Sequence, residues 1–109
     1  MDEIKLEGKW WSTYYNWLFC KGNISITLPK NIPNMYATQA RIKYTGIYRF
    51  MCDEVLPVII VNNGETQTIS AQYGRGVLTY TVKMDGDNVE GTYKLDCPID
   101  VGIVKMKKV

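Results

Sequence analysis

The residues able to perform acid–base or metal chemistry are few. Histidine is absent, which excludes the acid–base, metal-binding and nucleophile chemistry that depends on an imidazole ring. The segment 85–90 lacks the spacing of an EF-hand calcium loop and needs no ion to form a hairpin. The remaining candidate carboxylates fall in predicted turns or at strand ends: Asp53, Glu54, Asp85, Asp87, Glu90, Asp96 and Asp100. We therefore expect solvated turn residues, with no catalytic residue, no metal and no cofactor.

The three cysteines give no disulfide or zinc pattern. Cys20, Cys52 and Cys97 are odd in number and widely spaced, and no C-x-x-C occurs. Buried free thiols are the expectation. The first residues have no basic segment followed by an apolar one, and no apolar run approaches the ~18 residues of a membrane span. We expect a cytoplasmic or virion location, no membrane span and no secretion by a classical signal peptide.

Aromatic residues are the feature most in need of explanation. The chain has three Trp and eight Tyr among 109 residues, and six aromatic residues lie between positions 10 and 19. The core of one small domain cannot hold them all, and exposed aromatic side chains are enriched at protein interfaces and in ligand pockets. The predicted interaction surface consists of Trp11, Tyr15, Trp17 and Phe19.

A second candidate surface is basic. Arg41, Lys43 and Arg49 share one parity of a predicted strand, and together with exposed aromatic residues they could stack single-stranded nucleic acid. The alternative is an ordinary solvated strand face. The formal net charge of only +2 falls below the balance of a dedicated nucleic-acid domain, so a nucleic-acid partner is not expected.

The elements that would position these residues are strands. Apolar and polar residues alternate over residues 78–84 and 89–95, and residues 85–88 (Asp-Gly-Asp-Asn) between them predict a hairpin turn. Residues 55–61 and 66–72 form a second predicted hairpin, because Asn63-Gly64 is a strong turn signal that places Gly64 at positive φ.

Further strands are predicted in the first half of the chain and at its end. Residues 4–10 alternate cleanly, and further alternating patterns occur at residues 24–28 and 40–50. In the segment 101–106 the alternation slips between Ile103 and Val104, which suggests a bulge. About eight antiparallel strands at hairpin spacing predict an all-β meander, a small closed barrel or sandwich, in a single domain over residues 1–109.

A short motif resembles the opening of a known family. Gly8-Lys9-Trp10, preceded by Leu6, resembles the G-x-W motif of the calycin barrels, the lipocalin and avidin group, and Gly91-Thr92-Tyr93 is a further similarity. The resemblance implies that the last strand closes against the first and that Trp10 plugs one end of the barrel. Lipocalins cover this tryptophan with an arginine of a late strand, whereas the last strand here offers only Lys105, Lys107 and Lys108.

Two hypotheses of different classes follow. The first is a non-enzymatic structural or assembly module that binds other protein subunits or itself, through outward aromatic residues and exposed strand edges. Abundant Ile, Lys and Asn and scarce Ala suggest an AT-rich coding genome and favour a viral structural protein, of minor-capsid type. The second is a calycin-like carrier of a small apolar ligand, and a single-stranded nucleic-acid-binding barrel is a further alternative. Trp10 is expected to be buried, and Trp11 or Trp17 largely exposed.

Overall fold

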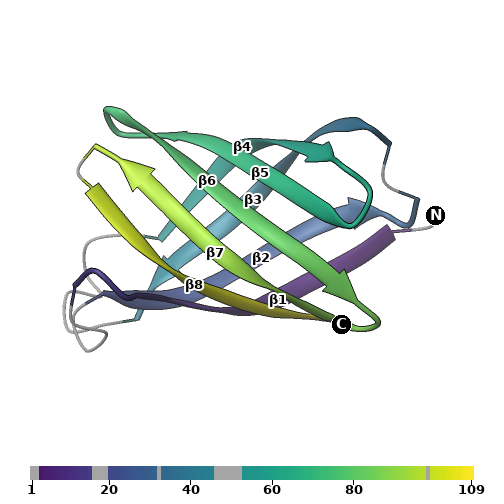
Figure 1. Cartoon of the computed structure of the whole chain (residues 1–109), viewed down its shortest axis with the longest axis horizontal. Helices are drawn as coiled ribbons and strands as arrows, with labels where there is room; N and C mark the ends of the chain where they lie inside the picture. The colour runs from purple at the N-terminus through teal and green to yellow at the C-terminus, as the bar shows by residue number, and fades with distance from the viewer. Residues whose placement is uncertain (1–2, 16–19, 32, 46–52, 98) are drawn as a thin grey trace.

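Eight antiparallel strands form a closed barrel in which each strand pairs with its neighbours in chain order and β8 pairs with β1 (Figure 1). The computed structural model describes residues 3–15, 20–31, 33–45, 53–97 and 99–109. The strands are β1 (Glu3–Ser12), β2 (Lys21–Pro29), β3 (Met35–Tyr44), β4 (Asp53–Asn62), β5 (Thr66–Tyr73), β6 (Gly76–Asp85), β7 (Asn88–Asp96) and β8 (Ile99–Lys108). The predicted all-β meander is confirmed, and the choice between barrel and sandwich is settled as a barrel.

The alternation of side chains decides which residues fill the barrel. Successive residues of a strand point to opposite faces, so one parity of every strand faces the interior. Apolar inward side chains from all eight strands join one core, with Leu6, Val89 and Val104 completely buried. Followed around the barrel, the pairing returns to β1 about ten residues further along, a stagger that tilts the strands steeply as closure of eight strands requires.

Both predicted hairpins are present. Asp85 pairs with Asn88 across a two-residue turn in which Gly86 has a φ of 61°. In the β4–β5 connection Gly64 has a φ of 91°, as predicted, and its N–H donates to Asn62 Oδ1 at 3.1 Å. The buried Gln67 side chain donates to the same Asn62 oxygen, also at 3.1 Å, and fixes the loop against the barrel end.

We expect Gly64→Val to lower the free energy of unfolding by about 1 to 3 kcal/mol through backbone strain, because a β-branched residue disfavours positive φ. A Cβ at this position meets open space, so steric overlap with neighbours contributes nothing. The melting temperature should fall by roughly 5 to 15 °C. Gly64→Asn is the matched control and should lose much less, since Asn tolerates positive φ. Equal losses for both variants would contradict the assignment to strain.

The predicted bulge in β8 is wrong. The register of β8 runs without interruption against both β1 and β7, and burial alternates regularly from Asp100 to Met106. The apparent slip in hydrophobicity arises because Asp100 and Gly102 face the interior at this end of the barrel, while Val101 and Ile103 face outward. At this end of β8 the usual pattern of apolar residues inward and polar residues outward is reversed, while the backbone continues without a bulge.

Candidate functional site: a buried polar end and two outer surfaces

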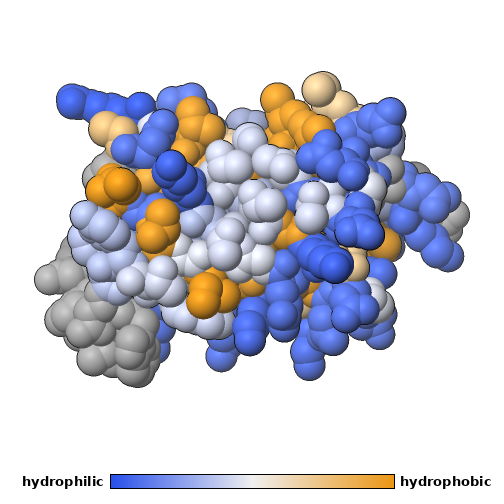
Figure 2. Space-filling view, in the orientation of Figure 1, coloured by the Kyte–Doolittle hydropathy of each residue, from blue (hydrophilic) through white to orange (hydrophobic). Residues whose placement is uncertain are grey.

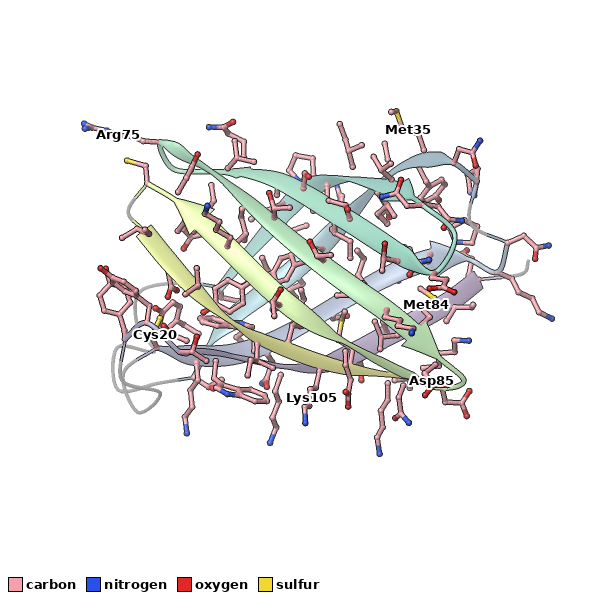
Figure 3. All side chains as sticks on the ribbon, in the orientation of Figure 1. Cys20, Met35, Arg75, Met84, Asp85 and Lys105 are labelled. Carbon is pink, nitrogen blue, oxygen red and sulfur yellow. The ribbon has the colours of Figure 1, made fainter. Side chains whose placement is uncertain are left out.

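A polar cluster lies inside the barrel at the end where β8 begins. The Asp100 side chain is buried, with 8% of its surface exposed. Its Oδ1 accepts a hydrogen bond from Ser12 Oγ at 2.6 Å, and its Oδ2 accepts bonds from Tyr93 Oη at 3.1 Å and Cys20 Sγ at 3.6 Å. Cys20 Sγ also lies 2.8 Å from Tyr44 Oη. The cluster therefore joins β1, β3, β7 and β8 with the residue preceding β2, and Figure 3 shows Cys20 at this end.

Aromatic rings pack beside this cluster and belong to the core or lie against it. The Trp10 ring makes edge contacts with Tyr44 and Tyr93, at centroid distances of 5.0 and 5.7 Å. Trp10 lies directly opposite Gly22, where an added Cβ would come within 2.7 Å of Trp10 Nε1, so glycine is needed to seat the indole. The buried Nε1 has no hydrogen-bond partner in the described part of the chain. Trp10 is therefore buried among aromatic rings at this end of the barrel.

The chemistry available to this cluster is limited. Burial raises the pKa of the Cys20 thiol and of the Tyr44 and Tyr93 phenols, so all three groups stay protonated near neutral pH. The Ser12 hydroxyl donates to Asp100 and accepts from the backbone N–H of Tyr15 at 2.8 Å. These two bonds connect the turn after β1 to the start of β8. The arrangement holds the barrel end together and presents no activated nucleophile among these side chains.

Asp100 was predicted to be a solvated strand-end residue, and this prediction is wrong. Its hydrogen-bond partner Ser12 lies 88 residues away in the sequence, so no local sequence pattern predicts this bond. The available signal was the inverted alternation of residues 100–103, which placed the carboxylate on the inward parity.

The aromatic residues predicted to form an interaction surface have different environments. Tyr15 is 47% exposed and packs edge-on against Tyr14, with their ring centroids 4.9 Å apart. Trp11 is half-buried on the outside of β1, although its neighbour Trp10 is buried as predicted. Trp17 and Phe19 lie outside the described residues. The structure thus places Tyr15 on the surface, but it exposes Trp11 only partly.

The predicted basic face is weakened by an acidic partner. Arg41 forms a bidentate ion pair with Asp53, with nitrogen–oxygen distances of 3.1 and 2.9 Å. This pair raises the pKa of Arg41 and lowers that of Asp53. Lys43 is exposed on the same face of β3, and Arg49 lies outside the described residues. Arg41 therefore contributes no uncompensated positive charge to this surface.

Cys20 and Cys97 are free thiols, and Cys52 lies outside the described residues. Cys20 is buried as expected, but Cys97 is exposed, because it lies in the turn between β7 and β8. Within the described ranges no three His, Cys, Asp or Glu side chains are grouped as a metal site would require. None of the described residues forms a helix long and apolar enough to cross a membrane.

A depression of about 610 Å³ lies on the outer wall over β1 and β2. Its floor is the Trp10–Gly22 pair, where the Trp10 side chain points inward and glycine has none, and its sides are the outward residues before and after this pair. Trp11 stands opposite Lys21 on one side of the depression, and Lys9 stands opposite Asn23 on the other. The Lys105 ammonium from β8 lies 6.0 Å from the centroid of the Trp11 ring.

Another part of the outer wall carries no charged side chain. This part, called the uncharged wall below, comprises outward residues of β4, β5, β6 and the adjoining end of β3: Met35, Ala37, Gln39, Pro57, Ile59, Val61, Thr68, Ser70, Gln72, Val77, Thr79 and Thr81. Ile59 at its centre is 51% exposed and pairs with Ser70. In Figure 2, pale side chains fill the middle of the visible face, and hydrophobic ones lie around it at the top, on the left and at the lower edge.

Fold and site together define a closed, eight-stranded antiparallel meander barrel with an aromatic and polar seal at one end. In comparisons with known proteins, the chain matches no family model, no curated protein and no solved structure.

Proposed function

We propose that the protein is a non-enzymatic structural or assembly module that docks against another subunit through the uncharged wall. The observation that supports this most directly is the exposure of Met35, Ile59 and Val77 within a surface of about a dozen residues that lacks any charge. Surface charges normally surround scattered apolar residues, and a contiguous charge-free area is typical of the centre of protein interfaces.

The composition of the wall favours a second copy of this chain as the subunit. Two complete rows cross four strands, Met35–Val61–Thr68–Thr81 and Ala37–Ile59–Ser70–Thr79. When such a surface meets its own copy around a two-fold axis, no charge is desolvated and no like charges meet. Threonine and serine hydroxyls both donate and accept hydrogen bonds, so the hydroxyls of one copy can pair with those of the other.

This surface replaces the docking mode expected from the sequence. Exposed strand edges were expected to take part, but each of the eight strands pairs with a neighbour on either side in the closed barrel. Backbone pairing with a partner strand is therefore blocked over most of the wall, and side-chain contact is the available mode. A capsid or other virus-particle subunit, the source favoured by the composition, would use an interface of this kind.

Analytical ultracentrifugation over a protein concentration range tests the proposal. The wall is smaller than the roughly 20 to 30 residues a side of standard interfaces, so we expect a dimer with a dissociation constant in the micromolar range or weaker. Ile59→Lys should weaken it by at least about tenfold, because two lysines would meet near the axis. Ser25→Lys, on the outward face of β2, is the matched control and should leave it unchanged. A chain that stays monomeric at about 1 mM contradicts the proposal.

A calycin relationship is a further proposal, supported by the eight-stranded meander, the β8–β1 closure and the position of Trp10. The lysine of the last strand does not replace the lipocalin arginine, because Lys105 lies over Trp11 outside the barrel rather than over Trp10. Apolar inward side chains from all eight strands belong to one cluster, which favours a filled barrel. Carriage of an apolar ligand is therefore the weaker of the two functional hypotheses.

A further inference from the structure

The closure of β8 against β1 brings two lysines directly opposite each other. Lys9 pairs with Lys105, and both side chains are exposed on the outer wall. Figure 3 shows Lys105 projecting away from the barrel. Neither lysine forms an ion pair with any residue that the structure describes. Like charges directly opposite each other in a sheet are destabilising, so this pair suggests a site that an anion would complete.

The positive charge continues across the neighbouring strands. In one row of outward residues, Lys105 pairs with Lys9, Lys9 with Asn23, and Asn23 with Lys43. This lysine row crosses β8, β1, β2 and β3, a length of about 14 Å at the usual spacing of strands. Acidic residues bound it, since Glu90 is opposite Lys105 and Asp53 is opposite Lys43. The row is therefore a short positive track with defined ends.

An aromatic ring stands beside this track. Trp11 lies two residues after Lys9 on the same outer face of β1, and it forms one side of the 610 Å³ depression. The depression is lined by Lys9, Trp11, Lys21, Asn23 and Thr45 together with the Trp10–Gly22 pair, so no acidic side chain of the described residues enters it. The Lys105 ammonium near the Trp11 ring completes a basic and aromatic groove.

We propose that this groove binds a short stretch of single-stranded nucleic acid, with one base against Trp11 and phosphates along Lys105, Lys9 and Lys43. An aromatic ring next to a positive track is the arrangement that sequence-tolerant single-strand binders use. The track is longer than one nucleotide, which favours a strand over a free mononucleotide. The acidic residues at both ends limit the contact to a few nucleotides, so binding is weak and strongly salt-dependent.

The basic surface expected from the sequence contained Arg41, Lys43 and Arg49. The groove retains Lys43, leaves out the neutralised Arg41, and adds lysines of the first and last strands that only barrel closure brings together. It lies on β8, β1, β2 and β3, whereas the uncharged wall lies on β4, β5, β6 and the far end of β3. The two surfaces can therefore act at the same time, and each can fail without the other.

Fluorescence polarisation with a labelled oligothymidylate and a labelled oligouridylate, each of about eight nucleotides, tests the proposal on the full chain. With three phosphate contacts, affinity should fall roughly 15- to 20-fold between 50 and 200 mM salt. Trp11→Leu should weaken binding by about 5- to 100-fold, and Trp11→Phe should restore most of it, because phenylalanine keeps the stacking surface. Both probes should bind, because a stacked base and phosphate contacts are available in DNA and in RNA.

The lysines have a matched control. Lys9→Gln and Lys105→Gln should each lower the slope of log affinity against log salt concentration by the amount expected for one lost phosphate contact. Lys83→Gln on β6 removes the same charge outside the groove and should change this slope little. Circular dichroism and melting curves confirm that each variant is folded before it is compared.

Three results would overturn the proposal. One is the absence of binding at about 1 mM protein in 50 mM salt. Another is equal binding of a duplex of the same length with no effect of Trp11→Leu, which would show nonspecific attraction to the lysines alone. The third is a mononucleotide such as AMP that binds as tightly as the oligonucleotide, which would make the groove a small-molecule site. Dimerisation through the uncharged wall is tested by a separate experiment, and its outcome does not depend on any of these three results.

Discussion

Replacing Asp100 by alanine is expected to lower the free energy of unfolding by about 2 to 4 kcal/mol, one of the two largest losses from a single side chain in this barrel. The carboxylate accepts bonds from Ser12, Tyr93 and Cys20, and its removal leaves these buried donors without their acceptor. Hydrogen bonds to a buried charged group are stronger than neutral ones, and an orphaned buried donor carries its full desolvation cost. Chemical denaturation followed by far-ultraviolet circular dichroism measures the loss.

Two further variants distinguish the loss of the buried hydrogen bonds from the loss of a negative charge alone. Asp100→Asn keeps one carbonyl acceptor of similar shape, so it should cost less than the alanine variant. Asp87→Ala removes an exposed carboxylate in the β6–β7 turn and should stay within about 0.5 kcal/mol of the parent protein. If Asp100→Ala lost no more than Asp87→Ala, the buried network would contribute nothing to stability.

The parts of the fold that were predictable from the sequence rest on local signals. Gly64 and Gly86 mark turns because positive φ excludes most other residues, and the alternation over residues 78–84 and 89–95 identifies two strands with one buried face. Closure of the last strand against the first was not visible in any local pattern. It was implied only by the resemblance of Gly8-Lys9-Trp10 to the calycin opening.

The surfaces were predicted less well, because they depend on which strands become neighbours. The sequence drew attention to Trp11, but it could not show that Lys105 would lie over its ring, since these residues are 94 positions apart in the chain. From the sequence, the charge of Arg41 was expected to contribute to a basic surface. The β3–β4 register instead places an Asp53 carboxylate oxygen 2.9 Å from the Arg41 guanidinium. The uncharged wall escaped notice for the same reason, because Ile59, Ser70 and Thr79 form a row only after three strands pair.

Truncation of Trp10 is the other substitution with a large expected effect. Trp10→Ala should lower the free energy of unfolding by about 3 to 5 kcal/mol, because it removes a buried ring and leaves a cavity between Tyr44, Tyr93 and Gly22. With a total stability of roughly 5 to 15 kcal/mol for a domain of this kind, the variant would approach the limit of folding at 25 °C. The measurement is a denaturant titration with a cooperative transition and well-defined native and unfolded baselines.

Trp10→Phe distinguishes packing from hydrogen bonding at the same position. Phenylalanine keeps a ring against Tyr44 and Tyr93 but has no N–H, and the buried Trp10 Nε1 has no partner among the described residues. If the ring contacts carry the stabilisation, this variant should lose only about 1 to 2 kcal/mol, the cost of the smaller volume. A loss as large as that of Trp10→Ala would mean that the indole N–H is satisfied in solution. A bound water or ligand would then occupy the sealed end of the barrel, and the filled interior that favours an assembly module over a carrier would have to be abandoned.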